Sequence, residues 1–188
     1  MNSGKPTLEF PEMEPETRLW QLILHIAERS QGDPTYGKVK LAKILYFADF
    51  SSYRRFGEPI TGTSYIKMQY GPVPRVFWDL LEEMEARGDI FVRQEPYYTH
   101  DQHRVIAKRD ADLTGFTGRD IALVDKIIQD FWGRTATEVS ELSHGMAWKV
   151  TRLKEPIPYD TAILSDEGIT QDDIDSAQEL IRDHEWEV

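Results

Sequence analysis

The chain has 188 residues, of which 40% are apolar and 29% are charged, so it is long enough for one globular domain with a sizeable core, or for such a domain with an appendage. It contains no cysteine, which excludes disulfides and thiolate metal ligands. The net charge of −11 is concentrated in residues 155–188, which hold eleven acidic residues and one basic residue. The chain therefore lacks the basic surface that a phosphate-binding protein needs, and a basic partner is more compatible with its charge.

The N-terminal residues 1–15 contain three prolines and no long apolar segment, so we expect a flexible or extended arm and no secretory signal. The chain has no run of about 18 apolar residues, and no transmembrane helix is predicted. Without a signal sequence or cysteines, a cytoplasmic location is the simplest expectation. We therefore predict three parts: the arm at residues 1–15, a domain at residues 16–162 and an acidic C-terminal helix within residues 163–188.

Two helices are predicted in the first third of the chain. Apolar residues recur at helical spacing between residues 16 and 28 and indicate the first helix. In residues 39–50, nine of twelve side chains are apolar or aromatic and lie nearly all round the helix, which predicts a central helix buried among several neighbours. Gly57 and Pro59 end this helix.

The predicted central helix also carries a narrow polar stripe, with Phe47 among its members. The stripe could contact nucleic acid or an acidic protein surface, although long cationic stems that cover an apolar helix are the ordinary explanation. Its polar members are Lys40, Lys43, Ser51 and Arg54.

A small β element and a third helix are expected next. Residues 65–70 alternate in polarity and predict a short strand, whereas residues 71–74 contain two prolines and are interpreted as a joint between strand and helix. The third helix runs from Pro74 to about Arg87, and two strands follow at residues 90–95 and 103–108. This order of elements resembles a winged-helix arrangement. The predicted fold class is mainly α with a small antiparallel β element (α+β), a compact helical bundle around a buried central helix.

Three more helices are predicted in the last third of the chain. Residues 118–132 form the fourth helix, and Thr135 and Glu138 fit a capping box that opens a short fifth helix ending at Leu142. Residues 142–148 then form a compact polar and aromatic knot. Thr170 caps a last helix at residues 171–183, which has an apolar stripe on one face made by Ile174, Ala177, Leu180 and Ile181.

Two blocks of the sequence resemble the Panacea domain family, also called SocA-like antitoxins. The first block comprises Lys40–Asp49, Pro59–Gly62 and Tyr70–Pro74, the second comprises Glu141–His144 with Trp148, and the resemblance covers about residues 19–161. The motif residues, most of which we expect to be structural, are Lys40, Leu41, Lys43, Tyr46, Asp49, Tyr70, Gly71, Pro72, Pro74, Ser143, His144 and Trp148.

The resemblance implies an antitoxin that neutralises a cognate toxin by direct protein contact and occlusion, with the toxin encoded by the adjacent gene. Some members of the family are thought to deliver the toxin to a protease, and this adaptor role is one alternative. A winged-helix-like transcription regulator is another, but the predicted recognition helix carries Asp79, Glu82, Glu83 and Glu85, which would repel phosphates. No catalytic motif or cofactor loop occurs, so neither enzymatic activity nor a cofactor is expected.

The acidic C-terminal end departs from the family pattern and is the predicted toxin-binding segment. It is either a solubilising helix or a mimic that covers a basic, nucleotide- or RNA-binding surface of the toxin in a hetero-oligomer. The candidate contact residues are Asp172, Asp173, Asp175, Glu179, Leu180, Asp183 and Trp186. Whether this helix docks on its own domain or on the partner stays open from the sequence.

Several motif residues have both a structural and a functional interpretation. Tyr70–Pro74 could be a rigid contact loop, but a fixed joint explains its prolines equally well. Asp49 needs a hydrogen-bonding partner in a buried helix, for which Arg54, Arg55, a tyrosine or His144 would serve. Ser143, His144 and Asp49 contain the groups of a hydrolytic triad without the surrounding sequence of one, and we expect His144 to form a hydrogen bond near Trp148 instead. His100 and His103 lie in a predicted hairpin turn with no further metal ligand nearby.

Overall fold

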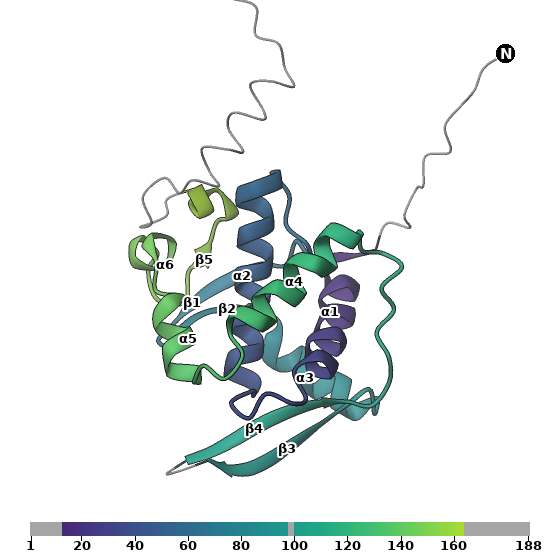
Figure 1. Cartoon of the computed structure of the whole chain (residues 1–188). Coiled ribbons are helices and arrows are strands. Elements are labelled where there is room, and N and C mark those ends of the chain that lie inside the picture. The colour runs from purple at the N-terminus through teal and green to yellow at the C-terminus, as the bar shows by residue number, and fades with distance from the viewer. Residues whose placement is uncertain (1–12, 98–99, 164–188) are drawn as a thin grey trace, which may run out of the picture.

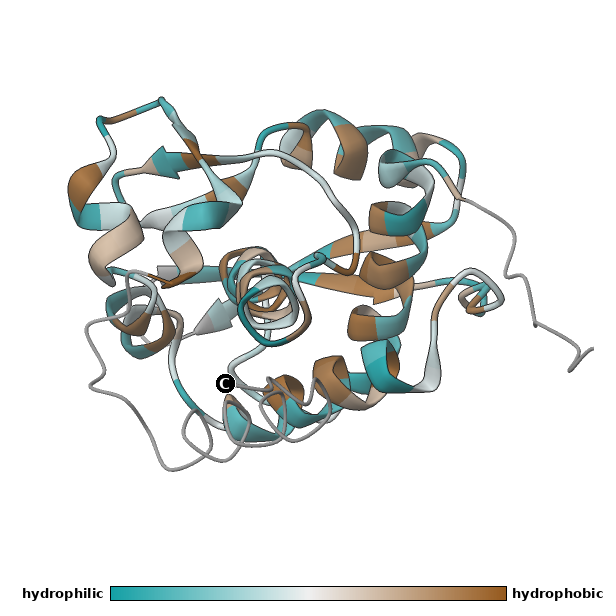
Figure 2. Ribbon diagram, turned by 90° about the horizontal axis from the view of Figure 1, so that it is seen from above, coloured by the Kyte–Doolittle hydropathy of each residue, from teal (hydrophilic) through white to brown (hydrophobic). Residues whose placement is uncertain are grey.

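The helix α2 (Lys38–Phe56) runs through the middle of the molecule, and the other elements surround it. The computed structural model describes residues 13–97 and 100–163. Figure 2 looks nearly along the axis of α2 and shows neighbouring elements on all its sides. Eleven of its 19 residues are buried, which confirms the prediction of a buried central helix. The helix ends at Gly57, whose φ of 78° is the left-handed conformation that glycine adopts most readily.

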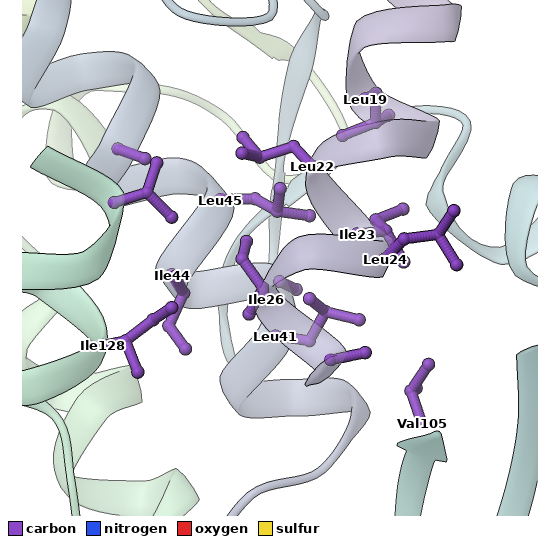
Figure 3. Packing of buried hydrophobic residues seen from close by; sticks show 14 of the residues in the cluster. Leu19, Leu22, Ile23, Leu24, Ile26, Leu41, Ile44, Leu45, Val105 and Ile128 are labelled. Carbon is purple, nitrogen blue, oxygen red and sulfur yellow. The ribbon is translucent and has the colours of Figure 1, made fainter. Parts of the chain in front are cut away.

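The main core lies between α2 and the helices α1 (Pro15–Arg29) and α4 (Gly118–Asp130). Figure 3 shows Leu22 of α1, Leu45 of α2 and Ile128 of α4 among the side chains that fill this space. All three are at most 5% exposed. A third helix, α3 (Phe77–Ala86), adds four buried side chains to the same core. The amphipathic patterns in the sequence therefore predicted the correct buried faces.

Two small antiparallel sheets complete the fold, and the predicted α+β class is confirmed, although the sequence predicted a single small β element. The hairpin β3 (Ile90–Tyr97) and β4 (His100–Ala107) extends along one end of the molecule. The second sheet has the order β2-β1-β5 and is made by β1 (Tyr65–Met68), β2 (Gly71–Pro74) and β5 (Pro156–Ile157).

The strand β2 corrects the interpretation of residues 71–74 as a joint. It pairs with β1 in a register that places Lys67 opposite Pro72 and Tyr65 opposite Pro74. The two prolines are tolerated because β2 is at the edge of its sheet, where a residue without an N–H can face away from the neighbouring strand. Since this segment is extended, α3 begins at Phe77 and not at Pro74.

Three short helical elements form the C-terminal side of the described chain. They are α5 (Ala136–Leu142), α6 (Met146–Val150) and the 3₁₀ helix η1 (Tyr159–Ile163). The predicted capping box at the start of α5 is present, because Thr135 Oγ1 accepts from the backbone of Glu138 and the carboxylate of Glu138 accepts from the Thr135 N–H. The predicted last helix and most of the N-terminal arm lie outside the described residues. Within residues 13–97 and 100–163, no helix combines the length and apolar character needed to cross a bilayer.

Candidate functional site

Three charged side chains of α2 are buried, and this changes the interpretation of the basic stripe. Lys40 and Lys43 are each 1% exposed and Asp49 is 0% exposed. The two lysines therefore do not form a surface for nucleic acid or for a partner. This corrects the interpretation of Lys40 and Lys43 as members of an exposed polar stripe. A buried charge is tolerated in a folded protein when it is paired or hydrogen-bonded, so the partners of these three groups define what they do.

Lys40 closes a network between the start of α2 and the loop before α5. Its Nζ donates to Asp33 Oδ2 at 2.5 Å, to Thr35 Oγ1 at 2.7 Å and to the carbonyl of Arg134 at 2.8 Å. Burial alone would raise the pKa of Asp33, but the hydrogen bonds from Lys40 and Thr35 outweigh it and lower that pKa. This network joins segments nearly 100 residues apart and has a structural role.

Asp49, in the second half of α2, is held by several donors from the chain that follows the helix. Its carboxylate accepts from the backbone N–H of Thr61 at 2.6 Å, from Thr61 Oγ1 at 2.5 Å and from Tyr65 OH at 2.8 Å. A tyrosine was among the partners expected for this carboxylate. Burial raises the pKa of Asp49, and the hydrogen bonds act in the opposite direction. The arrangement fixes the loop before β1 on the side of α2.

Lys43 lies where the two motif blocks meet. Its Nζ donates to the carbonyl of Pro72 at 2.9 Å, and burial lowers its pKa to about 7. Gly71 has a φ of 99°, and a Cβ at this position would lie 2.3 Å from Ser143 Oγ and 2.7 Å from Lys43 Nζ. Ser143 Oγ donates to the carbonyl of Ser140 at 2.6 Å. Glycine is needed here because the backbone of β2 approaches both side chains closely.

His144 and Trp148 form the outer layer of this meeting point. Their rings are stacked with centroids 4.0 Å apart, and Trp148 Nε1 donates to the carbonyl of Met68 at 3.0 Å. The Nε2 of His144 is buried and has no hydrogen-bond partner within the described part of the chain, and the interaction between His144 and Trp148 is ring stacking. Burial, and the charge of Lys43, lower the pKa of His144.

The groups of a hydrolytic triad are not connected. Ser143 bonds the backbone of its own helical turn, Asp49 bonds Thr61 and Tyr65, and His144 stacks on Trp148. Among residues 13–97 and 100–163, no group of three or more histidines and carboxylates is placed to hold a metal ion. The geometry of the motif residues therefore does not support hydrolysis or metal binding at these positions.

The remaining motif residues are divided between core and surface. Leu41 is in the main core and Pro74 is buried in β2. Tyr46 packs against Phe50, with ring centroids 4.3 Å apart. Tyr70 occupies the turn between β1 and β2 and is 70% exposed, so of the proposed contact loop only its tip is accessible.

A surface groove lies beside the meeting point of the two blocks, and we call it the α2–α6 groove. It has a volume of about 560 Å³ and is bounded by α2, α5, α6 and η1 (Figure 1). Leu142 and Met146 are 50% and 38% exposed on its wall. Its lining residues are Tyr46, Phe47, Phe50, Ser51, Arg54, Glu141, Leu142, Ser143, His144, Gly145, Met146, Ala147, Lys149, Thr161 and Ala162.

A second groove lies at the opposite end of α5, and we call it the α2–β4 groove. It has a volume of about 600 Å³, and its walls include Val39 and Trp78, which are 41% and 47% exposed. Thr135 and Ala136 at the start of α5 complete one wall, whereas Leu142 at the end of α5 belongs to the α2–α6 groove. These two concave, partly apolar surfaces of the described residues are similar in size.

Sequence reasoning missed both grooves. The α2–α6 groove depends on Leu142 and Met146 being exposed, and the sequence offered one signal for it, the compact run at residues 142–148. The predicted toxin contacts, Asp172, Asp173, Asp175, Glu179, Leu180, Asp183 and Trp186, lie outside the described residues.

The fold and the site first define a class: a mainly helical α+β domain with buried ionic networks and two surface grooves. The antitoxin SocA-like, Panacea domain matches residues 41–149, more than half of the chain, and the chain belongs to this family. Searches of curated proteins and of solved structures each found no match to the chain. The family confirms the resemblance seen in the sequence, and it suggests a role related to toxin–antitoxin systems with a toxin as the general partner.

Proposed function

We propose that this protein is an antitoxin that neutralises a cognate toxin by direct binding and occlusion, without catalysis. The observation that carries the proposal is the match of the antitoxin SocA-like, Panacea domain to residues 41–149. The geometry is compatible with it, because Ser143, His144 and Asp49 have separate structural partners and the described surface carries grooves of the size that proteins use for binding.

The toxin contact is proposed to lie in the acidic C-terminal segment, opposite a basic nucleotide- or RNA-binding surface of the toxin. Residues 164–188 hold nine acidic residues and one basic residue, a net charge of −8. A surface of one sign attracts a partner of the other sign and orients it during the encounter. We further propose that the toxin is encoded by the adjacent gene.

Co-expression with the neighbouring open reading frame tests the proposal. Growth should stop when that gene is expressed alone and resume with this protein, and the two proteins should purify together. The variant that neutralises four acidic residues of the segment, D172N/D173N/D175N/E179Q, should lose rescue. A matched control neutralises four acidic residues on the exposed face of α3, D79N/E82Q/E83Q/E85Q, and should keep it. A harmless neighbour, or equal loss in both variants, would refute this account.

The toxin's half-life separates occlusion from delivery to a protease. Under occlusion, the toxin's half-life with this protein is at least as long as without it, whereas an adaptor shortens it. A transcription regulator is disfavoured by the exposed side chains of Asp79, Glu82, Glu83 and Glu85 on α3, because a carboxylate-rich face repels phosphates. An electrophoretic shift with the protein's own promoter, at moderate salt, would support that role instead.

A further inference from the structure

The α2–α6 groove combines an apolar floor with a charged rim. Tyr46, Phe50 and Ala147 are each buried at its base, whereas Leu142 and Met146 are exposed on its wall. Two cationic side chains, Arg54 of α2 and Lys149 of α6, line the groove together with one carboxylate, Glu141 of α5. A surface of this kind suits an amphipathic segment that carries acidic residues beside an apolar stripe.

The described chain ends at this groove. Thr161 and Ala162 of η1 form part of its wall, and η1 ends at Ile163. Residues 164–188 therefore follow directly from the groove, and these 25 residues carry a net charge of −8. Their predicted apolar stripe, Ile174, Ala177, Leu180 and Ile181, begins only 11 residues beyond Ile163.

We propose that residues 164–188 of this chain dock into the α2–α6 groove of the same molecule. The apolar stripe lies on the floor, and the acidic residues lie toward Arg54 and Lys149. In this arrangement the segment covers Leu142 and Met146 until a partner competes for it. The inference concerns the protein on its own and does not depend on the proposed antitoxin function.

Because the segment is part of the same chain, even a weak contact is sufficient to keep it in the groove. A segment joined by a short flexible linker meets its site at an effective concentration of about a millimolar, so an affinity too low to detect between separate molecules still fills the groove. The α2–β4 groove is the natural comparison, because it has a similar volume and also exposes apolar side chains. It lies at the other end of α5, and its rim carries Asp101 as well as Lys38.

Disulfide trapping in the full-length protein tests the proposal. The chain has no cysteine, so an introduced pair forms the only intramolecular disulfide. The test pair places one cysteine on the groove wall and one on the stripe, Leu142→Cys with Ala177→Cys. The control pair, Val39→Cys with Ala177→Cys, uses the other groove at a similar exposure, 41% against 50%. A free segment could reach both, because 14 extended residues span about 46–50 Å.

Docking predicts that the test pair closes at least about tenfold faster than the control pair under a mild oxidant, given the local concentration of a seated segment. Moving the segment's cysteine off the stripe, with Ser176→Cys in place of Ala177→Cys, should slow closure. Charge reversal by R54E/K149E should slow closure of the test pair about tenfold, and 1 M salt should act in the same direction. The charge-matched reversal R75E/K108E, away from the groove, should leave the rate unchanged.

Equal closure rates for the two pairs would overturn the proposal. So would a rate for the test pair that neither R54E/K149E nor 1 M salt changes; the salt measurement needs no substitution on the rim, so it stands even if the reversed variant folds poorly. A closure rate that rises with protein concentration, with disulfide-linked dimers as product, would show instead that a second copy occupies the groove.

Discussion

Replacing Gly71 by alanine should destabilise this protein more than any other glycine-to-alanine change at a left-handed position among the described residues. The φ of 99° at Gly71 is a conformation that costs a residue with a Cβ about 1–3 kcal/mol. The new Cβ would also lie 2.3 Å from Ser143 Oγ and 2.7 Å from Lys43 Nζ. Ser143 cannot rotate without losing its bond to Ser140, and Lys43 is 1% exposed and bonded to Pro72.

Because neither neighbour can move freely, the overpacking adds about 1–3 kcal/mol to the backbone strain. The expected loss is therefore about 2–6 kcal/mol in the free energy of unfolding, a large part of the 5–15 kcal/mol that is typical of a domain. Urea denaturation followed by circular dichroism measures this loss directly.

The control is Gly88→Ala, which has the same kind of backbone strain without the close contacts. Gly88 has a φ of 77°, and a Cβ there would meet nothing within 4 Å. Its loss should be about 1–2 kcal/mol, the cost of the left-handed conformation alone. If Gly71→Ala costs no more than Gly88→Ala, the close approach of β2 to Lys43 and Ser143 is not a constraint, and the structural account of the motif fails.

Three further predictions concern the buried charges of α2. In urea denaturation, Asp49→Asn should lower the free energy of unfolding by about 2–4 kcal/mol, because it affects every donor to the carboxylate. Tyr65→Phe should lower it by about 1 kcal/mol, because it removes one donor, and equal losses in the two variants would contradict this. Lys43 has a folded-state pKa of about 7, below its unfolded value, so between these values the unfolded chain binds a proton that the folded protein does not. The free energy of unfolding of the wild type should therefore rise by up to about 1.4 kcal/mol per pH unit between pH 7.5 and 9.5, and Lys43→Met should lack this rise. Asp33→Asn should cost about 3–5 kcal/mol, because the buried charge of Lys40 loses its counter-ion. The double variant Asp33→Asn with Lys40→Met should recover part of that loss in the same assay.

The central helix and its ends could be predicted from the sequence because the signals are local. A surface that is apolar nearly all round residues 39–50 has one physical solution, burial among several neighbours. Gly57 ends the helix, as the sequence predicted, and the structure adds that it does so in the left-handed conformation. The capping box at Thr135 and Glu138 was also predictable, since both of its hydrogen bonds lie within one helical turn.

The roles of Lys40 and Lys43 could not be predicted in the same way. A lysine in an apolar helix ordinarily extends its stem to water, and no residue pattern near Lys40 or Lys43 indicates otherwise. Their burial depends on acceptors supplied from elsewhere: Lys40 bonds the carbonyl of Arg134, 94 residues away, and Lys43 bonds that of Pro72. The strand at residues 71–74 was missed for a related reason, because proline is acceptable in a strand only at a sheet edge, and edge position is a property of the tertiary structure.

Because the motif is buried, the residues that identify the family are not the residues that can select a partner. Lys40, Lys43, Asp49 and Ser143 are each at most 1% exposed, so they cannot touch another protein while the domain is folded. They hold α2, the β1–β2 hairpin and the α5–α6 segment in one arrangement, and this arrangement creates the α2–α6 groove beside them. A domain built in this way can keep its interior chemistry while the side chains on the groove wall change, since surface substitutions away from buried networks usually have little effect on stability. Partner choice is therefore expected to depend on positions outside the motif that names the family, such as the acidic residues of the segment 164–188 and Met146 on the groove wall.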